Sequence, residues 1–98
     1  MTRLTITRPD DWHLHLRDGE MLKAVLPHSA SWAGRDIIMP NLVPPVVTGN
    51  DASAYRARIE QALSDGYDFT PLMVLYLTQQ SDPADIRAAH ETGVIQAV

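Results

Sequence analysis

Cysteine is absent from the 98 residues, which excludes a disulfide scaffold and thiolate metal ligands. Any metal ion must therefore be held by nitrogen and oxygen ligands. Basic residues are also few, because 8 Lys and Arg stand against 12 Asp and Glu and give a net charge of -4. No run of five basic residues occurs, so the sequence argues against nucleic acid or an anionic membrane surface as a partner.

Long hydrophobic runs are missing as well. The longest, residues 72–77, is far too short to span a bilayer, and the first four residues lack the apolar stretch of a signal peptide. We therefore expect no membrane partner and a location in the cytoplasm. The hydrophobic share of 45% and the charged share of 20% are those of an ordinary globular chain. No linker or repeat divides residues 1–98, so we expect them to belong to one domain without an internal boundary.

Apolar segments of strand length recur along the chain. The first alternates apolar and polar residues, and the third is apolar on both faces, as in a strand buried on both sides. The four predicted strands cover residues 12–16, 37–39, 69–77 and 94–98. Within the third, Met73 and Tyr76 are expected in the core.

Helical spacing of apolar residues separates these strands. The first predicted helix covers residues 21–26 and ends at Pro27. The second has Thr48 as N-cap with an acidic residue three positions later, and the third has Asp82 as N-cap followed by proline. Glycines at positions 66 and 93 are expected to stop these two helices. Strands and helices alternate, which predicts a parallel α/β fold.

Two parallel architectures are compatible with this order. A doubly wound sheet would place a glycine-rich phosphate loop after its first strand, and no G-x-G-x-x-G motif occurs. A barrel places polar functional side chains after several strands. Such residues stand at or just past the ends of three strands here: His13, His15 and Arg17 at the end of the first, Asn41 past the second and Thr78 past the third. We therefore expect a (β/α)8 barrel of roughly 250 residues, of which this chain supplies about the first three and a half units.

The sharpest chemical feature is the pair His13 and His15. Residues i and i+2 of a strand point the same way, about 6–7 Å apart, so the two imidazoles can converge on one metal ion. Neutral imidazole suits zinc, iron or nickel. The alternative is two unrelated histidines, since H-x-H also arises often by chance.

Two further polar residues could contact a substrate. Arg17 lies two residues beyond His15, where its planar fork could grip a carboxylate, although it could equally be a solvated surface arginine. Asn41 lies in a proline-stiffened loop and could direct a hydrogen bond, although a plain turn asparagine is the simpler interpretation. Asp18 and Gly19 are interpreted as a simple turn.

Several motifs together resemble those of one enzyme family. Residues 10–19, Asp-Asp-Trp-His-Leu-His-Leu-Arg-Asp-Gly, resemble the opening motif of the dihydroorotases in the amidohydrolase superfamily. Residues 39–46 resemble the second signature of that family, and residues 69–73 and 76–78 are similar to its third strand. The Trp-His-Leu-His-Leu-Arg-Asp-Gly form resembles the single-function bacterial and fungal branch.

This resemblance implies a (β/α)8 barrel that holds two zinc ions and reversibly converts N-carbamoyl-L-aspartate to L-dihydroorotate in pyrimidine biosynthesis. By the same resemblance His13 and His15 bind the more buried zinc, and Arg17 and Asn41 hold the α-carboxylate of the substrate. A homodimer is also expected.

The family bridges its two zinc ions with a carboxylated lysine, and residues 94–98 resemble the stretch before it. That lysine is expected just after Val98, and the remaining zinc ligands and the general base are expected beyond it. No catalytic base is assigned within the chain, and the 98 residues alone are not expected to be active. Two alternatives stay open: another amidohydrolase such as a hydantoinase, and a metal-free barrel scaffold or partner subunit.

Overall fold

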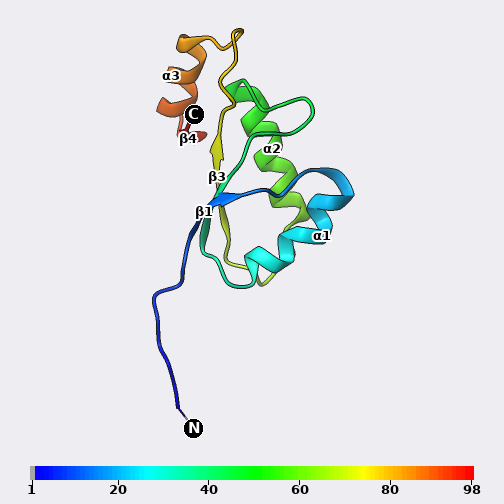
Figure 1. The fold of residues 1–98 in the computed structure, drawn as a ribbon, viewed down its shortest axis with the longest axis vertical. Helices are drawn as coiled ribbons and strands as arrows, with labels where there is room; N and C mark the ends of the chain where they lie inside the picture. The colour runs from blue at the N-terminus through cyan, green and yellow to red at the C-terminus, as the bar shows by residue number, and fades with distance from the viewer. Residues whose placement is uncertain (1) are drawn as a thin grey trace.

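Strands and helices alternate strictly along the chain in a computed structural model that describes residues 2–98 (Figure 1). Met1, the first residue of the predicted domain, lies outside the described residues. In order the elements are β1 (Asp11–Leu14), α1 (Gly19–Ala30), β2 (Arg35–Ile38), α2 (Gly49–Ala62), β3 (Thr70–Val74), α3 (Pro83–Glu91) and β4 (Ile95–Ala97). The predicted alternation of strands and helices is confirmed.

The strands form one parallel sheet in the order β1-β2-β3-β4, so strands that follow one another in the chain are neighbours. Right-handed crossovers between such strands place successive helices on the same face. This sequential order is that of a barrel wall, whereas a doubly wound sheet reverses its order near the first strand. The carboxyl ends of all four strands consequently meet at one edge.

The core lies between this sheet and its helices. Apolar side chains from β2, β3 and β4 pack there against α1 and α2. Met73 is only 1% exposed, as predicted, whereas Tyr76 is 45% exposed, so its assignment to the core is wrong. Because Leu75 takes the buried side, the alternation of an extended chain directs Tyr76 to the opposite face of the sheet.

Local capping signals place two of the helices. Thr48 and Asp51 form a complete capping box at the start of α2, and Asp82 accepts a hydrogen bond from the Ala84 N–H at the start of α3. The predicted end of the first helix at Pro27 is wrong, because α1 continues to Ala30 with Pro27 inside it. Burial of Leu26 and Ala30 against the core outweighs the backbone hydrogen bond that the proline removes.

Residues 2–10 precede β1 as an arm without regular secondary structure (Figure 1). Its end is fixed where Asp10 receives hydrogen bonds from the Arg35 backbone N–H and guanidinium, the shortest 2.6 Å long. The guanidinium keeps the pKa of Asp10 below its usual value. Among the described residues, no helix combines the length and the hydropathy that a bilayer crossing requires.

Candidate functional site

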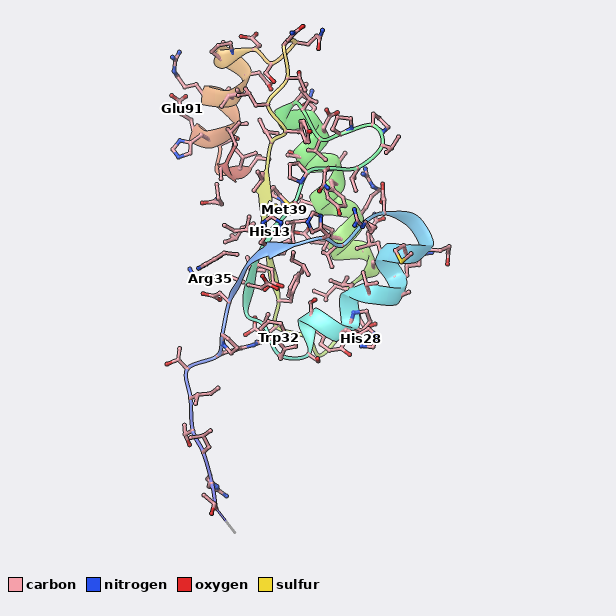
Figure 2. All side chains as sticks on the ribbon, in the orientation of Figure 1. His13, His28, Trp32, Arg35, Met39 and Glu91 are labelled. Carbon is pink, nitrogen blue, oxygen red and sulfur yellow. The ribbon has the colours of Figure 1, made fainter. Side chains whose placement is uncertain are left out.

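The two histidine rings of the first strand region meet at the carboxyl edge of the sheet. His13 lies in β1 and His15 just after it, and their Nε2 atoms are 3.1 Å apart. The ring centroids are 5.0 Å apart and the ring planes are inclined by 63°. Figure 2 shows His13 near Met39, which follows β2. Both histidines and Met39 line an open cavity of about 590 Å³.

The strand that presents them is shorter than predicted. β1 ends at Leu14 rather than at residue 16, and its register against β2 is irregular. The chain still stays beside β2, because the Met39 N–H donates a 2.8 Å hydrogen bond to the Leu14 carbonyl. Leu16 is completely buried on the core side. The two imidazoles therefore share the opposite side, as the i and i+2 spacing predicts.

The histidine pair fits a divalent metal ion of the zinc type. Two nitrogens bound to one tetrahedral zinc at about 2.0–2.1 Å lie roughly 3.3 Å apart, close to the separation of the two Nε2 atoms. The same separation fits a hydrogen bond between one protonated and one unprotonated ring. The Nδ1 atom of His15 is buried without a hydrogen-bond partner. Within residues 2–98 no group of three or more potential ligands gathers, so the pair by itself offers two nitrogens and not a complete coordination shell.

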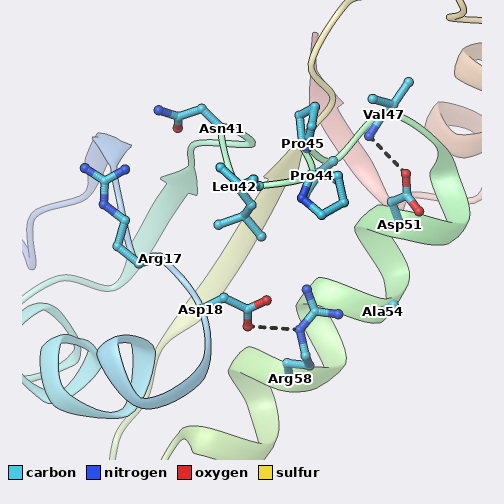
Figure 3. A pocket seen from close by; sticks show the side chains of 12 residues that line it. Arg17, Asp18, Asn41, Leu42, Pro44, Pro45, Val47, Asp51, Ala54 and Arg58 are labelled. Carbon is cyan, nitrogen blue, oxygen red and sulfur yellow. Dashed lines mark hydrogen bonds and ion pairs between the residues drawn. The ribbon is translucent and has the colours of Figure 1, made fainter.

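Arg17 and Asn41 line a second cavity of about 660 Å³ beside the first. Figure 3 shows their polar ends on the same side of this cavity. Asn41 also lines the histidine cavity, so the two spaces adjoin at its side chain. The structure thus brings together the four residues singled out in the sequence. A cation and an amide beside two converging imidazoles can bind the carboxylate of a small molecule while a second group of that molecule faces the histidines.

The loop that carries Asn41 is held at both ends. Pro40 accepts hydrogen bonds from the N–H groups of Leu42 and Val46, and the Tyr76 N–H donates a 2.7 Å bond to the Val46 carbonyl. Val46 is only 3% exposed. The position of Asn41 is therefore defined by backbone contacts with the region after β3.

Arg17 reaches the cavity by a turn rather than by continuation of the strand. Its φ of 59° is the left-handed conformation, which non-glycine residues rarely adopt. The hydroxyl of Tyr55, a buried residue of α2, donates a hydrogen bond to the Arg17 carbonyl. These two residues are 38 positions apart, and no spacing in the sequence indicates their contact.

Asp18 does more than form the simple turn that the sequence suggests. It caps α1 by accepting a 3.0 Å hydrogen bond from the Gly19 N–H. The same carboxylate oxygen accepts a 3.0 Å bond from Nε of Arg58 in α2, which Figure 3 shows. Asp18 followed by an acidic residue in the first turn was a local signal for the cap, whereas the partner on α2 had none.

Asp36 is, like Arg58, a charged residue whose environment has no signal in the sequence. It lies in β2 opposite Asp11 of β1, is completely buried, and has no hydrogen-bond partner for either carboxylate oxygen. Burial raises the pKa of its carboxyl to about 6, and the negative charges of Asp11 and Asp10 act in the same direction. Asp36 and Ile38 are two residues apart in β2, so both side chains point to the core side of the sheet. The Asp36 carboxyl therefore faces away from the histidine cavity.

In a comparison with known proteins, the relatives match nearly the whole length of this chain. Proteins named dihydroorotase from Ruegeria sp. (strain TM1040) and Jannaschia sp. (strain CCS1) are each 70% identical over 95 residues, or 97% of this chain. A dihydroorotase from Chelativorans sp. (strain BNC1) is 63% identical over 98 residues. The chain spans only 27–28% of the length of these three relatives. No protein-family model matches the chain.

Solved structures of similar fold are also dihydroorotases. The crystal structure of a dihydroorotase from Campylobacter jejuni matches 87% of this chain with a TM-score of 0.78 and 41% identity. A Saccharomyces cerevisiae dihydroorotase in complex with 5-fluoroorotic acid matches 89% with a TM-score of 0.79 and 30% identity. This chain covers 25% and 23% of those two proteins. The four-stranded sheet is therefore a partial barrel of the dihydroorotase type.

Proposed function

We propose that this chain, which corresponds in sequence and fold to the N-terminal part of the dihydroorotases, belongs to an enzyme that interconverts N-carbamoyl-L-aspartate and L-dihydroorotate. Identity of 70% to two proteins of that name supports the assignment. The observation that carries it is the convergence of His13 and His15 beside a cavity that Arg17 and Asn41 share. A metal-assisted reaction on a small acid requires these two features side by side.

Zinc is the metal proposed for the histidine pair. His13 and His15 would each contribute Nε2, the nitrogen that faces the other ring. When bound, zinc supplies Lewis acidity, which polarises a carbonyl oxygen and eases the deprotonation of water near pH 7. The family resemblance assigns two zinc ions and a bridging carboxylated lysine, which we propose just after Val98. The remaining ligands and the general base would lie in parts of the relatives that this chain does not cover.

Arg17 and Asn41 are proposed to hold the α-carboxylate of the substrate. The guanidinium offers a charged, planar fork, and the Asn41 amide fixes the direction of a further hydrogen bond. A substrate held in this way presents its ring amide toward the histidines, which turns the attack into a step within one complex. The acidic ligand of the yeast neighbour, 5-fluoroorotic acid, supports a site for a small acid.

Two other functions are less well supported. A hydantoinase-like amidohydrolase would share the two histidines, but its ring substrate needs no carboxylate site of the kind that Arg17 and Asn41 form. A metal-free scaffold or partner subunit would have no use for two converging imidazoles. The proposed enzyme is expected in the cytoplasm and as a homodimer, and no nucleic acid or membrane takes part in its reaction.

Steady-state turnover by the full-length protein tests the proposal. With zinc present, it is expected to hydrolyse L-dihydroorotate and to leave hydantoin, a cyclic ureide without the carboxylate, almost untouched. Removal of metal with a chelator is expected to abolish turnover, and added zinc to restore it. Equal turnover of both substrates would favour the hydantoinase alternative. A metal-loaded protein without activity on either would favour the scaffold.

A further inference from the structure

Arg17 has a backbone conformation that arginine, like other non-glycine residues, rarely adopts. Among residues 2–98 it is the sole non-glycine residue with a positive φ, at 59°. An arginine gains nothing from the left-handed region, because its Cβ then lies close to the following carbonyl oxygen. Such a conformation persists only where surrounding contacts impose it. The contacts around Arg17 therefore determine where its guanidinium points.

Tyr55 of α2 makes the contact that bears directly on this backbone. Its side chain is completely buried in the core, and its hydroxyl donates a hydrogen bond to the Arg17 carbonyl. Burial raises the pKa of the Tyr55 hydroxyl to about 12, so the group remains a protonated donor at neutral pH. A rigid, buried ring thus fixes one end of the Arg17 peptide unit while the side chain stays exposed at the cavity.

Arg58 adds a second contact from the same helix. It lies one turn after Tyr55, donates from Nε to Asp18, and places its guanidinium carbon 5.2 Å from the centre of the Tyr55 ring. Asp18 in turn caps α1. Two residues one turn apart in α2 therefore hold two consecutive residues of the loop after β1. Figure 3 shows the contact between Arg58 and Asp18.

We propose that Tyr55 is a positioning residue, which holds Arg17 in its left-handed conformation and so directs the guanidinium toward the carboxylate of the substrate. Arg58 supports the same loop through Asp18. This inference rests on the proposed function, since it concerns the residue assigned there to carboxylate binding. It adds that the affinity of the site for acids depends on a hydrogen bond from Tyr55, a buried residue that does not line the cavity.

A double-mutant cycle in the full-length protein tests the coupling. Tyr55→Phe keeps the ring and removes only the donor, so the KM for L-dihydroorotate is expected to rise roughly 3- to 10-fold, the effect of one lost hydrogen bond, with kcat nearly unchanged. In an Arg17→Met background the same substitution is expected to change KM no further. Where turnover is too slow, the Kd for 5-fluoroorotic acid gives the same comparison.

Tyr67→Phe is the matched control, because this exposed tyrosine loses a hydroxyl outside both cavities and is expected to leave KM unchanged. Should Tyr55→Phe fail to fold, Arg58→Gln takes its place under the same criterion. An unchanged KM in the single variant, or an equal rise with and without Arg17, would overturn the inference. Absence of dihydroorotate turnover in the unsubstituted protein would instead count against the proposed function.

Discussion

Asp36 is a carboxylate that is both completely buried and without hydrogen bonds. A charge in that position loses its hydration and gains no partner in exchange. Arg8 is the cation that acts on it, but the Arg8 guanidinium donates to the carbonyls of Ala30 and Ala33. The neutral, protonated form is therefore favoured, and the pKa of Asp36 rises to about 6.

This burial predicts a stability that depends on pH in a defined direction. Since the folded protein binds the Asp36 proton more tightly than the unfolded chain does, its contribution to stability is complete below about pH 4 and is lost as the pH rises through 6. Asp36→Asn mimics the neutral form of the carboxyl. The free energy of unfolding of this variant is therefore expected to exceed that of the unsubstituted protein by nearly zero at pH 4 and by about 2–3 kcal/mol at pH 7.

Urea unfolding of the full-length protein at several pH values between 4 and 7 measures this advantage. Asp65→Asn is the control, because Asp65 is exposed and its substitution is expected to have little effect at any pH. An advantage of Asp36→Asn that stays constant across this range would contradict the account of the buried carboxyl.

At the level of single residues, the sequence predicts geometry correctly where that geometry depends on spacing along the chain. His13 and His15 are two residues apart, and the local geometry alone brings their rings together. The sequence does not indicate Tyr55, Arg58 or Asp36. The roles of these residues depend on contacts between elements that are distant in sequence, and an isolated tyrosine or aspartate carries no sign of such a contact.

Helix α2 is the element that links most parts of the site region. Its N-terminal capping box joins Thr48 and Asp51, and the hydrogen bonds from the Thr48 and Val47 N–H groups keep the pKa of Asp51 below its usual value. The carboxylate also complements the positive end of the helix dipole. This cap fixes the start of the helix that later carries Tyr55.

Loss of the cap is expected to destabilise the protein by about 1 kcal/mol in Thr48→Ala, because the Asp51 N–H loses its acceptor. The free energy of unfolding measures this change. Ser53→Ala removes a hydroxyl from the exposed face inside the same helix, where alanine has the higher helix propensity, and is expected to be neutral or slightly stabilising. Equal effects of the two substitutions would contradict the capping account.

Gly49 marks the contact between α2 and α3. A Cβ at this position would lie 2.9 Å from the Cβ of Ala89, and the Gly49 N–H donates a 3.0 Å hydrogen bond to Asp85. Gly49→Ala is expected to cost about 1–3 kcal/mol, because the two helices must separate. The double substitution Gly49→Ala with Ala89→Gly removes the clash and is expected to recover part of this loss in the free energy of unfolding. A Gly49→Ala variant as stable as the unsubstituted protein would contradict the close packing.

The elements were predictable to the extent that their signals are local. The caps at Thr48 and Asp82 and the alternation of strands and helices depend on neighbouring residues, and the structure confirms them. The continuation of α1 through Pro27 depends on the burial of Leu26 and Ala30 in the tertiary core. Such burial can override the local helix propensity, and the residues next to Pro27 give no sign of it.

At the scale of the whole molecule, sequential parallel strands place every strand end at one edge. This topology brings the histidines at the end of β1 and Asn41 after β2 into adjoining cavities, although they come from different βα units. The absence of a glycine-rich phosphate loop and the polar residues after successive strands were sufficient to favour a barrel from sequence alone. The bounds of the strands could not be predicted in this way, since β1 and β3 end earlier than their apolar runs.

The proposed zinc site requires that His13 and His15 bind one ion together. Anomalous diffraction at the zinc absorption edge, from crystals of the full-length protein, tests it most directly. A peak is expected about 2.0–2.1 Å from the Nε2 atoms of both histidines. Crystals whose zinc peaks lie away from this pair, or whose two rings bond only to each other while zinc is present in the solution, would contradict it.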